Sequence, residues 1–129
     1  MRSLRDLILF LFILVPLVGC NQKTEPPLTT QKVGGMVVYK NGKPFADGGT
    51  IEFRHQAKTG VTSISGIDAN GTFSLYSITA QRKVSGAEEG SYEVTITPNS
   101  NDQNVRPILL KKKYEVVSGT NDLTIQIED

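Results

Sequence analysis

The chain has 129 residues, with 14 Lys and Arg against 13 Asp and Glu, and it contains one cysteine and one histidine. The first nineteen residues hold Arg2, Arg5 and Asp6, so the rest of the chain carries 12 charges of each sign. This balance argues against nucleic-acid binding, which needs a concentrated basic face, and one cysteine cannot form a disulfide within the chain.

The N-terminal segment has the three zones of a secretory signal peptide. Arg2 and Arg5 precede an unbroken apolar run at residues 7–17 (LILFLFILVPL), and small residues follow as far as Gly19. The run is shorter than the roughly 20 residues that a membrane-spanning helix needs, and Pro16 disrupts a helix near its end. We therefore predict a cleaved signal peptide over residues 1–19.

The end of this segment, Leu17-Val18-Gly19-Cys20, resembles a bacterial lipobox at all four positions. The resemblance implies cleavage between Gly19 and Cys20, a diacylglycerol thioether on the Cys20 thiol, and a fatty acyl group such as palmitate on the new amine. Several acyl chains hold a protein stably at a bilayer, whereas one chain is marginal. The alternatives are an ordinary signal peptide or an uncleaved anchor, each with an incidental cysteine.

Residues 20–32 are predicted to form the lipidated cysteine and a flexible tether. They are polar, contain Pro26-Pro27 and show no apolar periodicity. Twelve residues reach at most roughly 40 Å, so the folded part would stay near the membrane. Residues 33–129 have a suitable length for one domain with a modest core.

Short β-type runs separated by turn residues fill this domain, without helical periodicity. The runs cover residues 33–39, 50–55, 61–67, 72–76, 91–97, 108–110, 114–117 and 123–127. Asn41-Gly42 is a hairpin signal, since both residues tolerate positive φ, and Asp47-Gly48-Gly49 and Ser118-Gly119 mark further turns. Residues 77–90 and 99–113 contain less regular segments.

Alternation along these runs places apolar side chains on one face, as expected for half-buried strands. The predicted inward residues include Ile51, Phe53, Phe73, Leu75, Tyr92, Val94, Ile96, Leu123, Ile125 and Ile127. Each strand has one apolar face to cover, so two sheets must pack together. The expected fold is therefore all-β, a single antiparallel sandwich of six to eight strands, transthyretin-like or immunoglobulin-like.

The order of these turns resembles the carboxypeptidase regulatory-like domain, a transthyretin-like sandwich common in small bacterial lipoproteins. Residues 35–53 (GMVVYKNGKPFADGGTIEF) match its opening strand, Asn-Gly-Lys-Pro, Gly-Gly turn and second strand. Later matches are Asp68, Asn70, Gly71, Phe73, Gly90, Tyr92, Val94, Lys113, Tyr114, Gly119 and Asn121. The resemblance implies a sandwich architecture and export; it implies no peptidase activity.

Candidate chemical sites each have a simpler interpretation. His55 is too isolated for a three-ligand zinc site and is predicted to be a solvated residue at a strand end. Asp68-Ala69-Asn70-Gly71 lacks the distal glutamate of a calcium loop and is expected to be a turn. Lys111-Lys112-Lys113 could touch anionic headgroups, although a solvated loop is favoured.

Catalytic sets are also poorly supported. No Gly-x-Ser-x-Gly elbow is present, although composition alone does not exclude a Ser-His-Asp set. The single histidine and the ending Gln126-Ile127-Glu128-Asp129 depart from the transthyretin-related hydrolases. An isopeptide crosslink from Lys32 or Lys40 to Asn121 is disfavoured, because no buried acid is expected beside these strand ends.

The sequence therefore favours a non-enzymatic, lipid-anchored envelope module with a structural or protein-interaction role. We expect no cofactor, metal or nucleic acid, a location on the periplasmic face or the cell surface, and partner contacts at an edge strand or at residues 77–90 or 99–113. The alternative is a module that binds a sugar or peptide. Only Tyr39, Tyr76, Tyr92 and Tyr114 could offer aromatic platforms, and Tyr92 is expected to be buried.

Overall fold

The computed structural model describes Gly19, residues 27–80 and residues 82–128. These residues form ten strands and no helix. The strands are β1 (Val33–Val38), β2 (Gly49–His55), β3 (Thr62–Ile67), β4 (Thr72–Ser74), β5 (Tyr76–Ile78), β6 (Lys83–Ser85), β7 (Gly90–Pro98), β8 (Ile108–Leu109), β9 (Tyr114–Val116) and β10 (Asn121–Gln126).

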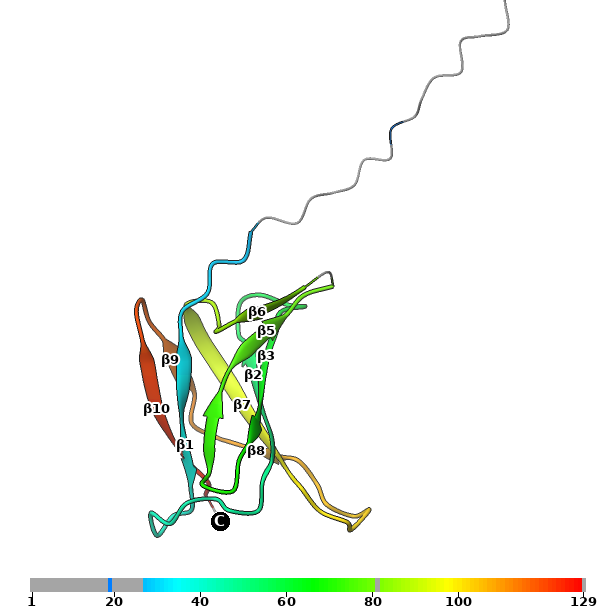
Figure 1. Cartoon of the computed structure of the whole chain (residues 1–129), viewed down its shortest axis with the longest axis vertical. Coiled ribbons are helices and arrows are strands. Elements are labelled where there is room, and N and C mark those ends of the chain that lie inside the picture. The colour runs from blue at the N-terminus through cyan, green and yellow to red at the C-terminus, as the bar shows by residue number, and fades with distance from the viewer. Residues whose placement is uncertain (1–18, 20–26, 81, 129) are drawn as a thin grey trace, which may run out of the picture.

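Two sheets pack against each other, which confirms the predicted all-β sandwich (Figure 1). The ten strands of the described residues exceed the predicted six to eight, and β6 lies in a segment that was expected to be irregular. The smaller sheet has the order β10-β1-β4. The larger has the order β6-β5-β3-β2-β7-β8, and β9 also pairs with β7. All pairs are antiparallel except β1 with β10, whose parallel register runs from Val33↔Asn121 to Val38↔Gln126. The first and last strands of the sandwich therefore lie side by side in the smaller sheet. This parallel pairing was not predicted from the sequence.

Alternation in β2 and β7 builds the centre of the core. Ile51 and Phe53 from β2 and Tyr92, Val94 and Ile96 from β7 are fully buried, as predicted. The Phe53 ring lies 5.7 Å from the Tyr92 ring and 6.1 Å from the Phe73 ring, centroid to centroid. Because β2 and β7 pair along seven positions, these large side chains form one continuous layer.

The small sheet covers this layer. Val33 and Val37 of β1 and Ile125 of β10 are fully buried, and Ile127 is nearly so. Leu123 is only partly buried against the same core. The chain changes sheets between β4 and β5 at Leu75, whose side chain is 2% exposed. Leu75 therefore fills the core at the point where one predicted strand divides into two.

The structure explains why apolar and polar residues alternate poorly along β3. Its inward positions include Ser63 and Ser65, which are buried although polar. Ser63 Oγ lies 2.8 Å from Ser77 Oγ, and Ser77 Oγ donates to the Gly86 carbonyl at 2.7 Å. Ser65 Oγ accepts a bond from the Ser74 N–H. Hydrogen-bonded serines take the place of apolar side chains on this face.

The Asn41-Gly42 hairpin forms, with a different turn from the one predicted. The Gly42 N–H donates to the Tyr39 carbonyl at 2.9 Å, and the Tyr39 N–H donates to the Lys43 carbonyl at 2.8 Å. Among the described residues only glycines have positive φ, and Gly42 has a φ of 83°. Asn41 therefore keeps a negative φ, as in a type I turn followed by a glycine bulge.

Candidate functional surfaces at the two ends of the sandwich

Cys20, the predicted lipidation site, lies outside the described residues, so its modification remains a prediction. Its neighbour Gly19 at the predicted cleavage point is exposed. Among the residues that the structure describes, no helix has the length and hydrophobicity needed to cross a bilayer.

The chain enters the sandwich through residues 30 and 31, which are hydrogen-bonded to it. Gln31 and Ala87 exchange two backbone bonds of 2.7 and 3.0 Å, and Thr30 Oγ1 donates to the Ser85 carbonyl at 2.6 Å. The Gly119 N–H also donates to Gln31 Oε1 at 2.9 Å. A Cβ on Gly86 would lie 2.1 Å from the Gln31 carbonyl oxygen, so this close approach requires glycine.

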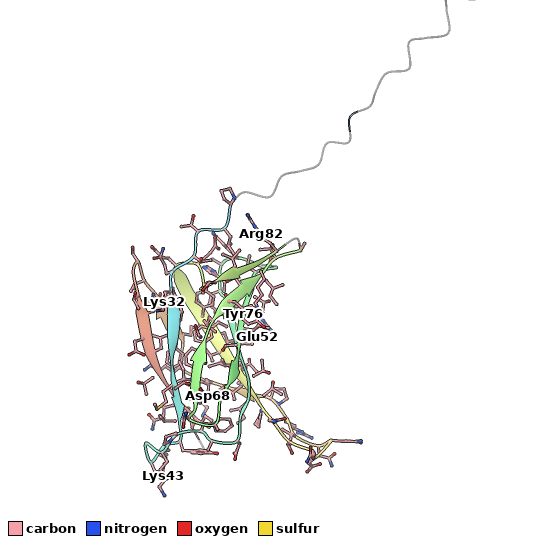
Figure 2. All side chains as sticks on the ribbon, in the orientation of Figure 1. Lys32, Lys43, Glu52, Asp68, Tyr76 and Arg82 are labelled. Carbon is pink, nitrogen blue, oxygen red and sulfur yellow. The ribbon has the colours of Figure 1, made fainter. Side chains whose placement is uncertain are left out.

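We use the term tether end for residues 27–32, 56–61, 78–80, 82–89 and 117–120. Figure 1 shows the incoming chain beside the β5–β6 hairpin at this end. Figure 2 places Arg82 there as well, whereas Asp68 and Lys43 lie at the opposite end. Residues 27–32 therefore join the domain at one end, and Asp68 and Lys43 lie at the other end (Figure 2).

A cleft of about 950 Å³ opens at the tether end. The incoming chain lines it with Pro27, Leu28, Thr29 and Gln31, and the other lining residues are Ala57–Val61, Thr79, Ala80, Arg82, Glu88 and Glu89. Lys58 Nζ lies 2.9 Å from Glu88 Oε2. The Glu88 side chain is 11% exposed, whereas that of Lys58 is 57% exposed. The cleft thus carries charges of both signs, and one carboxylate is held by a cation from the facing loop.

The prediction that His55 is solvated is wrong, because the structure buries it to 9% exposure. Its Nδ1 accepts bonds from the Ala57 N–H at 3.0 Å and the Lys58 N–H at 3.1 Å. Its Nε2 therefore carries the hydrogen and donates to the Glu89 carbonyl at 3.1 Å. His55 continues the inward alternation of Ile51 and Phe53, and it fixes the loop that forms one wall of the cleft.

Tyr92 lies directly across from this histidine on β7, and its burial was predicted. The two rings meet edge to face, with centroids 4.9 Å apart. The Tyr92 hydroxyl donates to the Glu88 carbonyl at 2.8 Å. Burial raises the pKa of the Tyr92 hydroxyl to about 12, and the negative charge of Glu88 contributes to the rise. Tyr92 therefore stays neutral and supports the segment that presents Glu88.

The other tyrosines offer few aromatic platforms. Tyr114 is also buried, at 6% exposure. Tyr39 is half-buried and its hydroxyl donates to Asp47 Oδ2 at 2.6 Å. Tyr76 is half-buried too, and Lys83 Nζ lies 3.8 Å from the centroid of its ring. The Tyr76 face is therefore already occupied by a cation within the chain.

Asp68-Ala69-Asn70-Gly71 forms the predicted turn. Asp68 Oδ1 accepts bonds from the Asn70 and Thr72 N–H groups, each at 2.9 Å, and its Oδ2 accepts a bond from the Thr72 hydroxyl. These bonds, chiefly those from Thr72, lower the pKa of Asp68. The carboxylate is thus used within its own turn. In the described part of the chain, no group of three or more His, Cys, Asp and Glu is arranged to hold a metal.

Asn121 has a structural role that the sequence analysis missed. Its Nδ2 donates to the carbonyls of Val117 at 2.9 Å, Gly119 at 3.2 Å and Lys32 at 3.3 Å. Its Oδ1 accepts a bond from the Val117 N–H at 2.9 Å. One buried amide therefore closes the β9–β10 turn and ties it to the start of β1.

The distal loop, defined as residues 99–107, is exposed at every position. Figure 1 shows it protruding at the end opposite the tether. The Asn104 N–H donates to Asp102 Oδ1 at 2.9 Å and the Val105 N–H to the Asp102 carbonyl at 3.3 Å, so the tip forms a turn. Val105 is 36% exposed and Leu109 of the adjoining β8 is 60% exposed.

Lys111-Lys112-Lys113 follows this region and is exposed, as a solvated loop would be. Lys112 Nζ lies 5.1 Å from the centroid of the Tyr114 ring. This contact is within the usual range for a cation–π interaction, so one of the three lysines is directed back toward the sandwich.

Comparisons of the chain with protein-family models, with curated proteins and with solved structures give no match.

Proposed function

We propose that this chain is a non-enzymatic, lipid-anchored module of the bacterial cell envelope that acts through structural or protein contacts. Its anchor is the acylated Cys20, and its membership of the carboxypeptidase regulatory-like lipoproteins is part of the proposal. The supporting observation is that residues 27–32, where the chain enters the sandwich, and the distal loop lie at opposite ends (Figure 1). A partner could therefore approach the loop without meeting the membrane.

Chemistry at the distal loop suits a protein partner. A long exposed loop with an internal turn presents Val105, and Leu109 of β8, four residues later in the chain, is also exposed. Loops placed on a rigid scaffold frequently carry binding residues. By contrast, the one histidine is engaged through both ring nitrogens with backbone groups, which removes the obvious general base.

Site-specific photocrosslinking in the native envelope tests this proposal. A benzophenone amino acid replaces Val105, and a matched control replaces Met36 in the middle of β1, because both side chains are 36% exposed. The proposal predicts a discrete protein adduct from position 105 that is absent from position 36. Identical patterns from both positions, or no adduct from either, would contradict it.

A small-ligand module is the second candidate, and the cleft at the tether end favours it. The cleft volume of about 950 Å³ is within the usual range for ligand sites. Its charges of both signs would suit a short peptide or a zwitterionic sugar derivative. Thermal-shift screening with sugars and short peptides tests this candidate: it predicts a stabilised transition that is lost in Glu88→Gln. No stabilisation by any compound would remove this candidate.

A further inference from the structure

The tether end carries an excess of exposed positive charge. Lys32, Lys58, Arg82 and Lys83 are all exposed there, and within the ranges that define this end the acidic residues are Glu88 and Glu89. Asp122 lies just beyond these ranges, opposite Gly34. Lys58 is bonded to Glu88 at 2.9 Å. That pair is neutral, which leaves three cations against the carboxylate of Glu89.

The β5–β6 hairpin combines these cations with an apolar side chain. Ile78 is 43% exposed and pairs directly with Lys83. Lys83 Nζ lies over the Tyr76 ring at 3.8 Å, which holds the cation on the outer surface of the hairpin. Arg82 follows the hairpin tip and borders the cleft beside Pro27 and Leu28. Apolar residues beside cations are typical of segments that lie in a membrane interface.

The short reach of the chain sets how far this surface can move from a membrane anchored at Cys20. Ten peptide units separate Cys20 from Thr30, the first residue that hydrogen bonds hold to the sandwich, and they span at most about 35 Å. Hydrogen bonds fix Thr30 and Gln31 to the sandwich, so those residues add no reach. An acylated Cys20 would thus keep the tether end within a few Debye lengths of the headgroups, where the screening length is about 8 Å.

We propose that the tether end is a docking face for anionic phospholipid headgroups, an inference that rests on the proposed lipid anchor. Lys32, Arg82 and Lys83 contact the headgroups, and Ile78 enters the interface. Docking turns the tether end toward the bilayer, so that the distal loop points away from it. Each basic residue near an anionic surface strengthens binding about fivefold.

Lysine footprinting on vesicles tests this orientation. The chain from residue 20 onward is coupled through the Cys20 thiol to a maleimide lipid, in vesicles of phosphatidylcholine alone or with about 30% phosphatidylglycerol. Acetylation rates at each lysine are measured by mass spectrometry. We expect acetylation of Lys32 and Lys83 to slow about threefold or more on the anionic vesicles, and to recover in 1 M NaCl, where the Debye length is about 3 Å. Lys43, at the opposite end in Figure 2, should be unaffected.

Two double variants supply the matched comparison. Arg82→Gln with Lys83→Gln should reduce the ratio of docked to undocked chain about thirtyfold and abolish protection of Lys32. Lys40→Gln with Lys43→Gln removes the same charge from the far end and should leave that protection intact. Equal protection of Lys32 and Lys43, or loss of protection in both variants alike, would overturn the docking face.

Failure of this inference can be distinguished from failure of the proposed function. Chemical coupling supplies the anchor in the vesicle experiment. A lack of protection of Lys32 and Lys83 from acetylation would therefore refute the docking face without bearing on the natural acylation of Cys20. Metabolic labelling of Cys20 in the native host refutes or supports the anchor without reference to orientation.

Discussion

Replacement of Asn121 tests how strongly one side chain holds the β9–β10 turn closed and joined to the start of β1. Asn121 is 6% exposed, and its amide makes two bonds of 2.9 Å to Val117 and longer bonds to Gly119 and Lys32. A net contribution of about 1 kcal/mol per bond applies to such contacts. The Lys32 carbonyl keeps its bond from the Asn121 N–H, and water can reach the exposed turn, so Asn121→Ala should cost about 2–3 kcal/mol.

Thermal and urea unfolding of the chain without residues 1–20 would measure this cost. A loss of that size in a domain of about one hundred residues lowers the Tm by roughly 10–20 °C. Thr124→Ala is the control, because Thr124 lies on the same strand and is exposed. If both variants unfold at the same midpoint, the bonding role of Asn121 is refuted.

Asn121→Asp adds a pH test of the same contacts. The ionised carboxylate would face three carbonyl oxygens, which favours the protonated form and raises the pKa of the introduced carboxyl group in the folded state. A group with a raised folded pKa contributes its stability below the unfolded value of about 3.9 and loses it as the pH rises. The variant should therefore be strongly destabilised at pH 7, and the difference from wild type should narrow below about pH 4.

Three further outcomes follow from the described contacts. Gly71→Ala should destabilise the fold more than Gly42→Ala, as chemical denaturation would show: both glycines have positive φ, but a Cβ at Gly71 lies 2.7 Å from the Val37 carbonyl oxygen and one at Gly42 meets nothing within 4 Å. Because folding raises the pKa of Tyr92 from 10 to about 12, the neutral hydroxyl stabilises the fold fully below pH 10, and this stabilisation is lost toward pH 12. The urea midpoint of Tyr92→Phe should therefore fall less than that of wild type between pH 10 and pH 12. An equal fall in both proteins would contradict the raised pKa of Tyr92. The lowered pKa of Asp68 contributes stability that is present above about pH 4 and lost in acid; Asp68→Asn should lose less stability than wild type as the pH falls below about 4, and an equal loss in both proteins would argue against the turn bonds.

Much of the fold follows from local alternation. Ile51 and Phe53 in β2, and Tyr92, Val94 and Ile96 in β7, were predicted as inward residues because a period of two is unambiguous in both strands. The same period places His55 inward, next after Phe53, so its burial was accessible from the sequence. The polarity of the imidazole suggested a solvent-exposed side chain instead, because no local sequence pattern reveals the backbone groups that bond to both ring nitrogens.

Other features depend on contacts that are distant in the sequence. The parallel pairing of β1 with β10 joins Val33 to Asn121, and no local pattern specifies such a partner. The change of sheet at Leu75 divides a run that alternates without interruption. The cleft is equally non-local, because it combines the incoming chain at Pro27 with Lys58 and Arg82 from separate loops. Local periodicity therefore predicted most of the strands and both layers. It did not predict the β5–β6 hairpin, which lies largely within residues 77–90, and tertiary packing determined the surfaces.

Metabolic labelling of the protein with a fatty-acid analogue in its native host tests the lipid anchor most directly. Wild-type protein should carry the label, begin at Cys20 by intact mass and fractionate with membranes. Cys20→Ala should be unlabelled and should leave the membrane fraction. An unmodified Cys20 thiol in the mature wild-type protein, or a mature chain that begins at another residue, would contradict the account.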